Sequence, residues 1–237
     1  RFYCSADSHD RLSYQPHVTG RHKIHCIVKD DICISEVDIE VEVKGINGSL
    51  TNPDSGVYIY SNSLYYPSSA WNREWEEQAE GVAIITDECR FLMAPNPVIG
   101  DWGGGEFTNV SDLTVIQDWR EAKFDYNGRK NTEALLNAKD VMRKVEFTEK
   151  CYNYDKDNPG KWYQPAAGQM YLIRQNLDEV QRCLSLIGGR KLKANEHYIS
   201  STAADGSHLW AISLTQFERI YFFLYEPDNR TYPVRDL

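Results

Sequence analysis

The stretch from Gly160 to Arg235 constrains the fold most, because its apolar pattern changes from a helical period to a strand period. After Pro165, apolar residues recur at i, i+3 and i+4 up to Gly188, which predicts a long helical region that Asn176 or Asp178 divides in two. From His197 on, apolar and polar residues alternate, as they do in strands. The expected strands are 209–214, 219–225 and 231–235, and the chain is expected to be α+β.

Four short motifs occur in this stretch in a fixed order. They are Trp162-Tyr163-Gln164-Pro165 with Gly168-Gln169, then Ser200-Ser201-Thr202, then Trp210, and last Val234-Arg235. This order resembles bacterial C-type-lectin-like domains, whose signatures are W-Y-L-P-(S/T)-x-G-E, Y-W-S-S-T, A-W and V-R-x-(V/F). Gln164 stands where the usual residue is Leu, and Ile199 where it is Trp.

The resemblance implies a C-type-lectin-like fold and a face for ligands. The same fold occurs in the variable proteins of diversity-generating retroelements, where outward side chains of the last strands and the loop before them contact the ligand. In such a protein, substitutions would gather on that face and spare Trp210, Ile212, Val234 and Arg235. Carried onto this chain, the expected ligand-binding residues are Asp205, Ser207, His208, Ala211, Ser213, Thr215, Gln216, Phe217, Tyr221, Phe223 and Tyr225.

The first part of the chain has a different pattern. Residues 22–28 and 37–43 alternate as two strands with a turn at Asp30-Asp31, and Val37, Ile39, Val41 and Val43 share one face. They are similar to the last strands of an immunoglobulin-like sandwich, which normally needs about 100 residues. The segment is therefore truncated or completed from outside this chain, for example by a neighbouring subunit.

Turn-forming residues from Lys44 to Gly56 indicate a linker, with a domain boundary near Gly48. The expected domains are residues 1–47, immunoglobulin-like, and residues 48–237, C-type-lectin-like. Within the second, the pattern predicts a strand at 56–60, a hairpin of 81–85 with 90–94 and a loop at 95–105. It also predicts a helix that Ser69 caps and that carries Trp71, Trp75 and Ala79, and a core helix at 131–145 that Thr132 caps.

Charge and hydropathy exclude two classes of partner. The net charge of -9 argues against nucleic acid, because such proteins present a basic face to the phosphates. The second class is the membrane: no stretch reaches the roughly 20 apolar residues that span a bilayer, so no membrane-spanning helix is expected. The first residues lack the layout of a signal peptide, so an export signal is expected to be removed or to lie upstream.

The six cysteines, three in each part, cannot all pair within their own part. Free buried thiols are favoured over one bridge between the parts. The cysteines lack the spacing of a zinc site, and no metal or cofactor is expected. Two strings look like calcium ligands, 155–160 and 226–229, but each is better explained as a turn.

No set of residues indicates catalysis, and the chain is not expected to be an enzyme. His197 and His208 lie near Ser200, Ser201 and Asp205 in the sequence, but the Ser-Ser-Thr motif is better explained as a corner whose hydroxyls bind loop backbone. The formylglycine-generating enzymes share the implied fold and use cysteine. Cys183, however, falls on an apolar helix face, where a core role is expected.

The favoured hypothesis is an adhesin or a phage receptor-binding protein. It would lie outside the cell, on a bacterial surface structure such as a pilus or on a virion, and bind a protein or glycan receptor. Two alternatives stay open: a structural pilus or virion subunit, and an oxidase of the formylglycine-generating type that uses Cys151 or Cys183.

Overall fold

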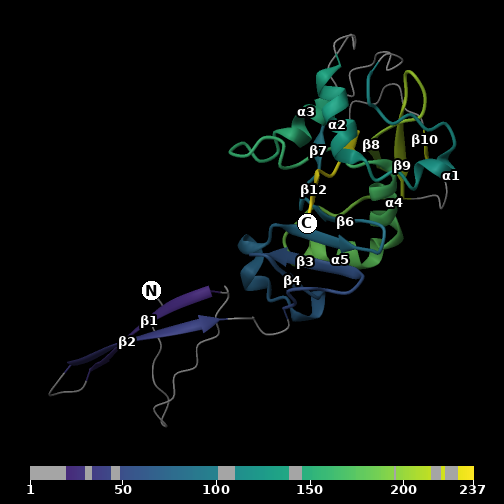
Figure 1. The fold of residues 1–237 in the computed structure, drawn as a ribbon. Helices are drawn as coiled ribbons and strands as arrows, with labels where there is room; N and C mark the ends of the chain where they lie inside the picture. The colour runs from purple at the N-terminus through teal and green to yellow at the C-terminus, as the bar shows by residue number, and fades with distance from the viewer. Residues whose placement is uncertain are drawn as a thin grey trace.

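The structure is a computed structural model that describes residues 20–29, 34–43, 49–100, 110–138, 146–194, 196–214, 220–221 and 229–237. It is a mixed α/β architecture in which the described strands form one hairpin and two five-stranded sheets (Figure 1). The strands are β1 (Gly20–Lys29), β2 (Ile34–Val43), β3 (Gly56–Ser61), β4 (Leu64–Tyr66), β5 (Gly81–Ile85), β6 (Arg90–Met93), β7 (Val98–Ile99), β8 (His197–Ala203), β9 (Leu209–Ser213), β10 (Ile220–Tyr221), β11 (Arg230–Thr231) and β12 (Val234–Asp236).

Five α-helices and two short 3₁₀-helices accompany these strands among the described residues. None of the described helices is long and apolar enough to cross a membrane. The helices are η1 (Ser68–Ala70), η2 (Arg73–Gln78), α1 (Trp119–Ala122), α2 (Gly128–Asn137), α3 (Glu146–Tyr152), α4 (Ala167–Gln175) and α5 (Leu177–Leu186).

The two N-terminal strands pair as an antiparallel hairpin, as their alternation predicts, with Ile24 opposite Ile39. One face is polar: the Asp38 carboxylate lies 2.8 Å from Lys23 Nζ and 2.6 Å from His25 Nδ1. Hydrogen bonds from these two side chains lower the pKa of Asp38. The other face is apolar and open. Its exposed side chains are Val37 at 53%, Ile39 at 45% and Val41 at 36%.

The main core lies between one five-stranded sheet, in the order β12-β6-β5-β3-β4, and the helices α4 and α5. The predicted hairpin of 81–85 with 90–94 is confirmed as β5 and β6. Figure 1 shows α5 behind this sheet, and α5 packs against β3 and β5. The buried side chains that meet there include Ile59, Ile84, Phe91, Met170, Ile173, Val180 and Leu184.

The second sheet has the order β10-β9-β8-β11-β7. The single closing strand expected at 231–235 is two short strands in different sheets: β11 pairs with β8 and β7, and β12 pairs with β6. Pro233 lies between them and has no N–H to donate to a ladder, which accounts for the break. Residues 230–236 therefore join the two sheets.

The long helical region divides at Asn176, one of the two expected positions. The Asn176 side chain donates to the Leu172 carbonyl, 2.9 Å away, and so caps the last turn of α4. The region ends where Gly188 takes a left-handed conformation with φ of 62°. Glycine is the residue that adopts this conformation without strain, so the expected stop at Gly188-Gly189 is confirmed.

Two helix predictions differ from the structure. The helix expected from Ser69 to Ala79 is two 3₁₀-helices, because the Asn72 side chain accepts the Glu74 N–H and starts a second helix between the two tryptophans. The helix expected at 131–145 begins earlier, at Gly128, and its last helical residue is Asn137. Residues 139–145 lie outside the described part. The segment expected to be a loop at 95–105 contains the short strand β7.

We expect Gly188→Ala to lower the free energy of unfolding by about 1–2 kcal/mol, because an L-residue is strained at positive φ. A Cβ atom there would also meet the Glu76 carboxylate. Urea unfolding followed by circular dichroism measures the change. Ser185→Ala, on the exposed side of α5, is the control and should leave stability within about 0.5 kcal/mol. Equal effects of the two substitutions would contradict the role of Gly188.

Candidate functional site

A buried polar network occupies the place where the first two motifs meet. Gln164 is fully buried, and its backbone N–H donates to Thr132 Oγ1 at 3.0 Å. Its side-chain oxygen accepts from Thr148 Oγ1 at 2.7 Å, and its amide nitrogen donates to the Ser200 carbonyl at 3.0 Å. Both ends of the amide are therefore satisfied, so a glutamine can be buried at the position where the motif that this stretch resembles has leucine.

The Ser-Ser-Thr motif on β8 completes this network. Ser200 Oγ donates to the Trp210 carbonyl at 2.8 Å, and Ser201 Oγ donates to the Gln164 carbonyl at 3.1 Å. Thr202 Oγ1 accepts the Ala167 N–H at 2.8 Å. The expected corner, in which these hydroxyls satisfy loop backbone, is confirmed. The two serine hydroxyls are thereby committed to backbone carbonyls.

Asp125 is the acceptor at the centre of the network. Its carboxylate is buried and receives Thr202 Oγ1 at 2.6 Å and Asn131 Nδ2 at 3.0 Å on one oxygen. The other oxygen accepts the backbone and side-chain N–H groups of Asn127 at 3.0 and 2.8 Å. Four donors on one carboxylate supply the hydrogen bonds that a buried charge needs.

The glycine and the glutamine of the first motif have separate roles. The Gly168 N–H donates to the Asp125 carbonyl at 2.8 Å, and a Cβ atom on Gly168 would lie only 2.5 Å from that carbonyl oxygen. Gln169 caps the start of α4, because its side-chain oxygen accepts the Ala166 N–H at 2.9 Å. Its amide nitrogen donates to Tyr163 Oη at 3.1 Å. The motif therefore fixes the entry of α4.

The closing motif, Val234-Arg235, holds the C-terminus against the first motif, which begins at Trp162. The Arg235 guanidinium pairs with Glu80 at 2.5 Å and lies 5.4 Å from the Trp162 ring centroid. Tyr163 Oη donates to Asp236 at 2.6 Å. Cation–π and charged hydrogen bonds thus join residues 162–163 to 235–236. Desolvation and the Asp236 carboxylate raise the pKa of Tyr163, so its hydroxyl stays a donor.

Three of the expected ligand-binding residues form one loop between β8 and β9. Asp205 Oδ1 accepts from the backbone N–H groups of Ser207 at 2.8 Å and His208 at 3.0 Å. The same carboxylate lies 2.8 Å from His208 Nδ1 and orients the imidazole. Desolvation raises the pKa of Asp205, but these hydrogen bonds outweigh it and the net pKa is lowered. The loop is therefore a pre-formed polar turn.

The expectation that Ala211 and Ser213 face outward is wrong. Ala211 is fully buried and Ser213 is 2% exposed. Strand β9 lies between β8 and β10 in the sheet, and both of its faces are covered: Ala211 packs into a cluster with Phe147, while Ile212 belongs to the main core. Alternation along a strand covered on both faces does not mark an exposed side.

The other expected ligand-binding residues are only partly placed. Tyr221 lies on β10 opposite Ala211, so the expected partner strand of β9 at 219–225 is confirmed for residues 220–221, and its other residues lie outside the described ranges. The Tyr221 side chain is outside the described part, so its contacts are not placed. The expected residues that lie outside the described ranges altogether are Thr215, Gln216, Phe217, Phe223 and Tyr225.

The first of the two calcium-like strings is a self-contained turn. Asp155 accepts the N–H groups of Asp157 and Asn158, both at 3.2 Å, and pairs with Lys161 at 3.3 Å. The second string, at 226–229, lies outside the described residues apart from Asn229. Within the described ranges, no group of three or more His, Cys, Asp or Glu side chains could hold a metal ion.

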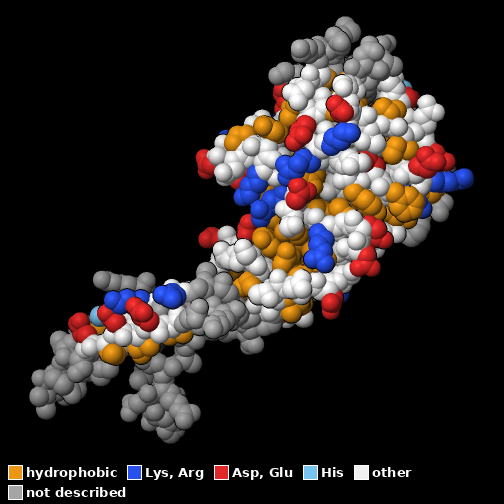
Figure 2. Space-filling model, viewed as in Figure 1, with side chains coloured by type: hydrophobic (Ala, Val, Ile, Leu, Met, Phe, Trp, Pro, Cys, Tyr) orange, Lys and Arg blue, Asp and Glu red, His pale blue; other side chains and the backbone are white. Residues whose placement is uncertain are grey.

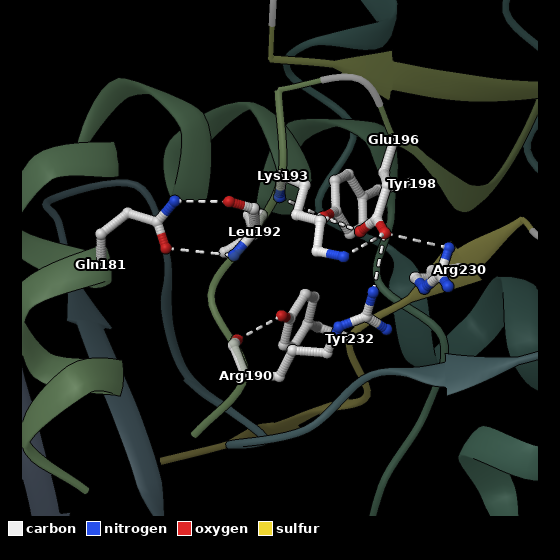
Figure 3. Close-up of polar contacts among 8 residues, drawn as sticks. All are labelled: Gln181, Arg190, Leu192, Lys193, Glu196, Tyr198, Arg230 and Tyr232. Atoms are coloured by element: carbon white, nitrogen blue, oxygen red, sulfur yellow. Dashed lines mark hydrogen bonds and ion pairs between the residues drawn. The ribbon is translucent and has the colours of Figure 1, made fainter. Parts of the chain in front are cut away.

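A second polar cluster holds the loop that leads into β8 (Figure 3). The half-buried Glu196 carboxylate lies 2.7 Å from Arg190, 3.2 Å from Arg230 and 3.7 Å from Lys193. Tyr198 Oη donates to the same carboxylate at 2.9 Å. On the other side, the Gln181 side-chain nitrogen donates to the Leu192 carbonyl, and the Gln181 side-chain oxygen accepts the Leu192 N–H. We infer that these contacts fix residues 190–194 and 196 against α5 and β11.

The described cysteines with placed side chains are free thiols. Cys151 and Cys183 are fully buried and Cys89 is half-buried. Desolvation raises the pKa of all three, to about 11 for Cys89 and about 12 for Cys183. Because the thiolate is the reactive form, burial makes these cysteines poor nucleophiles and poor metal ligands. Free thiols in the second part agree with the favoured expectation.

The sequence reasoning missed a group of aromatic side chains beside α1. Lys123 Nζ lies 5.7, 5.0 and 5.6 Å from the ring centroids of Trp119, Phe124 and Tyr171. Phe124 is 64% exposed. We call these four residues the Lys123 platform. The sequence shows a tryptophan, a lysine and a phenylalanine within six positions, which could have indicated this group. It does not show that Tyr171 joins them, because Tyr171 lies on α4, far along the chain.

We expect Asp125→Asn to lower the free energy of unfolding by about 1–3 kcal/mol. The amide NH₂ would face two donors on one side of the carboxylate site and leave them without an acceptor. Urea unfolding measures the effect. Asp157→Asn, in the exposed loop after Tyr154, is the matched control and should change little. If both variants unfold within about 0.5 kcal/mol of the wild type, Asp125 does not hold the network.

Comparison with known proteins places the fold beside one other structure. No family model matches the chain, and a search of the curated proteins found no match. Among solved structures, the chain is similar to a fimbrial protein from Bacteroides ovatus ATCC 8483, with a TM-score of 0.54 and 13% sequence identity. The likeness covers 90% of this chain and 56% of the fimbrial protein, so the chain spans little more than half of that protein's length. At this identity the likeness shows a shared fold.

Proposed function

We propose that this chain is a non-enzymatic binding module of a bacterial surface structure such as a pilus. The observation that carries the proposal is the fold it shares with a fimbrial protein over 90% of its length. The motif residues support a C-type-lectin-like architecture for residues 48–237, because their side chains stabilise the fold from within. The loops and the surface are then available to bind a ligand. Fold alone does not fix function, so the site must be tested directly.

The proposed ligand is a protein or glycan receptor on another cell. The loop from Asp205 to His208 is the best-placed part of the expected face. Its imidazole is oriented by a carboxylate, and its backbone N–H groups are satisfied within the turn. A pre-formed loop loses little conformational freedom when it binds, which favours affinity.

We expect the purified chain, coupled to fluorescent beads, to bind at least one cell type in a panel of bacterial and epithelial cells and His208→Ala to weaken that binding by about tenfold or more. Flow cytometry measures binding, and thermal melting confirms that the variant is folded. Lys156→Ala, on the exposed turn of 155–160, is the control. Unchanged binding by His208→Ala would remove this loop from the site, and no binding by the wild type would remove the proposed function.

A structural subunit is the second candidate, and the open face of the β1–β2 hairpin favours it. Val37, Ile39 and Val41 are exposed along one face of a two-stranded sheet, which is marginal alone in water. A neighbouring subunit that added a strand or a sheet would cover this face. The hairpin's other face is ion-paired and needs no cover.

We expect self-association of the chain in analytical ultracentrifugation if a second copy covers this face. Val37→Glu with Ile39→Glu should then give a monomer, because the charges would be desolvated in the contact. Glu40→Gln, on the polar face of β2, should leave association unchanged. A monomeric wild type would contradict coverage by a second copy.

The formylglycine-generating activity is the weakest candidate. It would need a reactive cysteine, whereas Cys151 and Cys183 are both fully buried and desolvation raises the pKa of both thiols. Incubation with cysteine-containing sulfatase peptides and copper, followed by mass spectrometry, tests it. An aldehyde product would contradict the non-enzymatic proposal.

A further inference from the structure

The Lys123 platform combines exposed aromatic surface with a cation that has no ion-pair partner among the described residues. Lys123 is half-buried, and among the described residues no carboxylate lies within ion-pair distance of its ammonium group. Three rings surround the ammonium instead. Rings stabilise a cation less than a carboxylate does, so the site retains attraction for an anion.

The platform stands on the rigid part of the molecule. Trp119 packs against the apolar cluster that contains Ala204 and Trp210. The residue after Phe124 is the buried Asp125 at the centre of the polar network. Tyr171 belongs to α4, whose first turn is hydrogen-bonded to Asp125 through Gly168. The backbone that carries the ammonium and the rings is therefore held in place by the core, which limits the conformational freedom lost on binding.

The platform also borders the expected ligand-binding loop. Trp119 belongs to the same apolar cluster as Ala204, the residue before Asp205. Figure 2 shows hydrophobic side chains on the surface beside α1 and α4, with basic and acidic side chains around them. Val115, 48% exposed, precedes α1 on the same stretch and pairs with Ala203. The aromatic surface of the Lys123 platform and the polar loop from Asp205 to His208 thus share the same apolar cluster beneath them.

We propose that the Lys123 platform binds a carboxylated sugar, which deepens the proposed binding function and rests on it. The ammonium would pair with the sugar carboxylate, and the ring faces would contact the C–H groups of the pyranose. One cation among rings fits a ligand with a single carboxylate. The chain's net charge of -9 repels dense polyanions such as nucleic acid or heavily sulfated glycans at longer range.

The test is binding of defined probes, measured by calorimetry on the whole chain. The probes are a sialyl-lactose, a glucuronic acid disaccharide, neutral lactose and a short acidic peptide. We expect the two carboxylated sugars to bind and the neutral sugar not to bind. Affinity should fall when salt rises from about 50 to about 500 mM, because a partly exposed ion pair is screened.

Two variants separate charge from ring contact. Lys123→Met keeps most of the stem and should lower affinity for both acidic sugars by about tenfold, and Phe124→Ala should lower it by a similar factor. Lys156→Met removes an exposed lysine from another loop and should change nothing. Amide chemical shifts of residues 119–124 should move with the ligand in the wild type.

Several results would overturn the inference. Equal binding of lactose and sialyl-lactose would remove the role of the carboxylate, and stronger binding of the acidic peptide would make the partner a protein. Full affinity in Lys123→Met, or shifts that avoid residues 119–124, would place the sugar elsewhere. If the chain binds cells but none of these sugars, the inference fails while the proposed function stands.

Discussion

The hydrogen bond from Thr202 to the buried Asp125 carboxylate is the contact on which the rest of the structure most depends. It joins β8 to the turn after α1, across 77 positions of sequence. Thr202 also accepts from Ala167, and Asp125 accepts from Asn131, so one contact reaches the starts of α4 and α2. Each of these segments has buried backbone N–H and C=O groups that need hydrogen-bond partners, and each supplies partners to the others. The loss of one segment would therefore weaken the rest, which makes the network cooperative.

A polar centre of this kind specifies one arrangement more than it adds stability. An apolar core tolerates small shifts, whereas the Gln164 amide is satisfied only when Thr148 and Ser200 are both in place. The surfaces proposed for binding lie directly beside this centre. Lys123 and Phe124 precede Asp125, and the loop from Asp205 to His208 follows β8. Their geometry is therefore inherited from the network, although they contribute little to it.

Much of the chain was predictable where one local rule decided the structure. The helix division at Asn176, the stop at Gly188 and the β5–β6 hairpin follow from capping, left-handed glycine and alternation. Prediction failed where the surroundings decided. Ala211 alternates like an exposed residue, yet layers on both faces of β9 bury it. Two tryptophans at helical spacing gave 3₁₀-helices because Asn72 caps between them.

The candidate site shows the same division. The scaffold role of the Ser-Ser-Thr motif was predictable, since hydroxyls near loop backbone usually bind it. The Lys123 platform was not, because Tyr171 lies on α4, far along the chain from α1 and the turn after it, and only tertiary contacts bring these segments together. Five of the eleven expected ligand-binding residues lie outside the described ranges, and the side chain of Tyr221 is not placed either. The described part of the expected face is therefore the loop from Asp205 to His208.

Native-state hydrogen exchange of the network amides tests the central claim most directly. The relevant N–H groups are those of Gln164, Ala167 and Ser201, each bonded within the network. If the structure depends on this centre, these amides exchange only through global unfolding, with the same free energy as Ile84 on the fully buried strand β5. Exchange of the three amides through a local opening of much lower free energy, while Ile84 stays protected, would contradict the account.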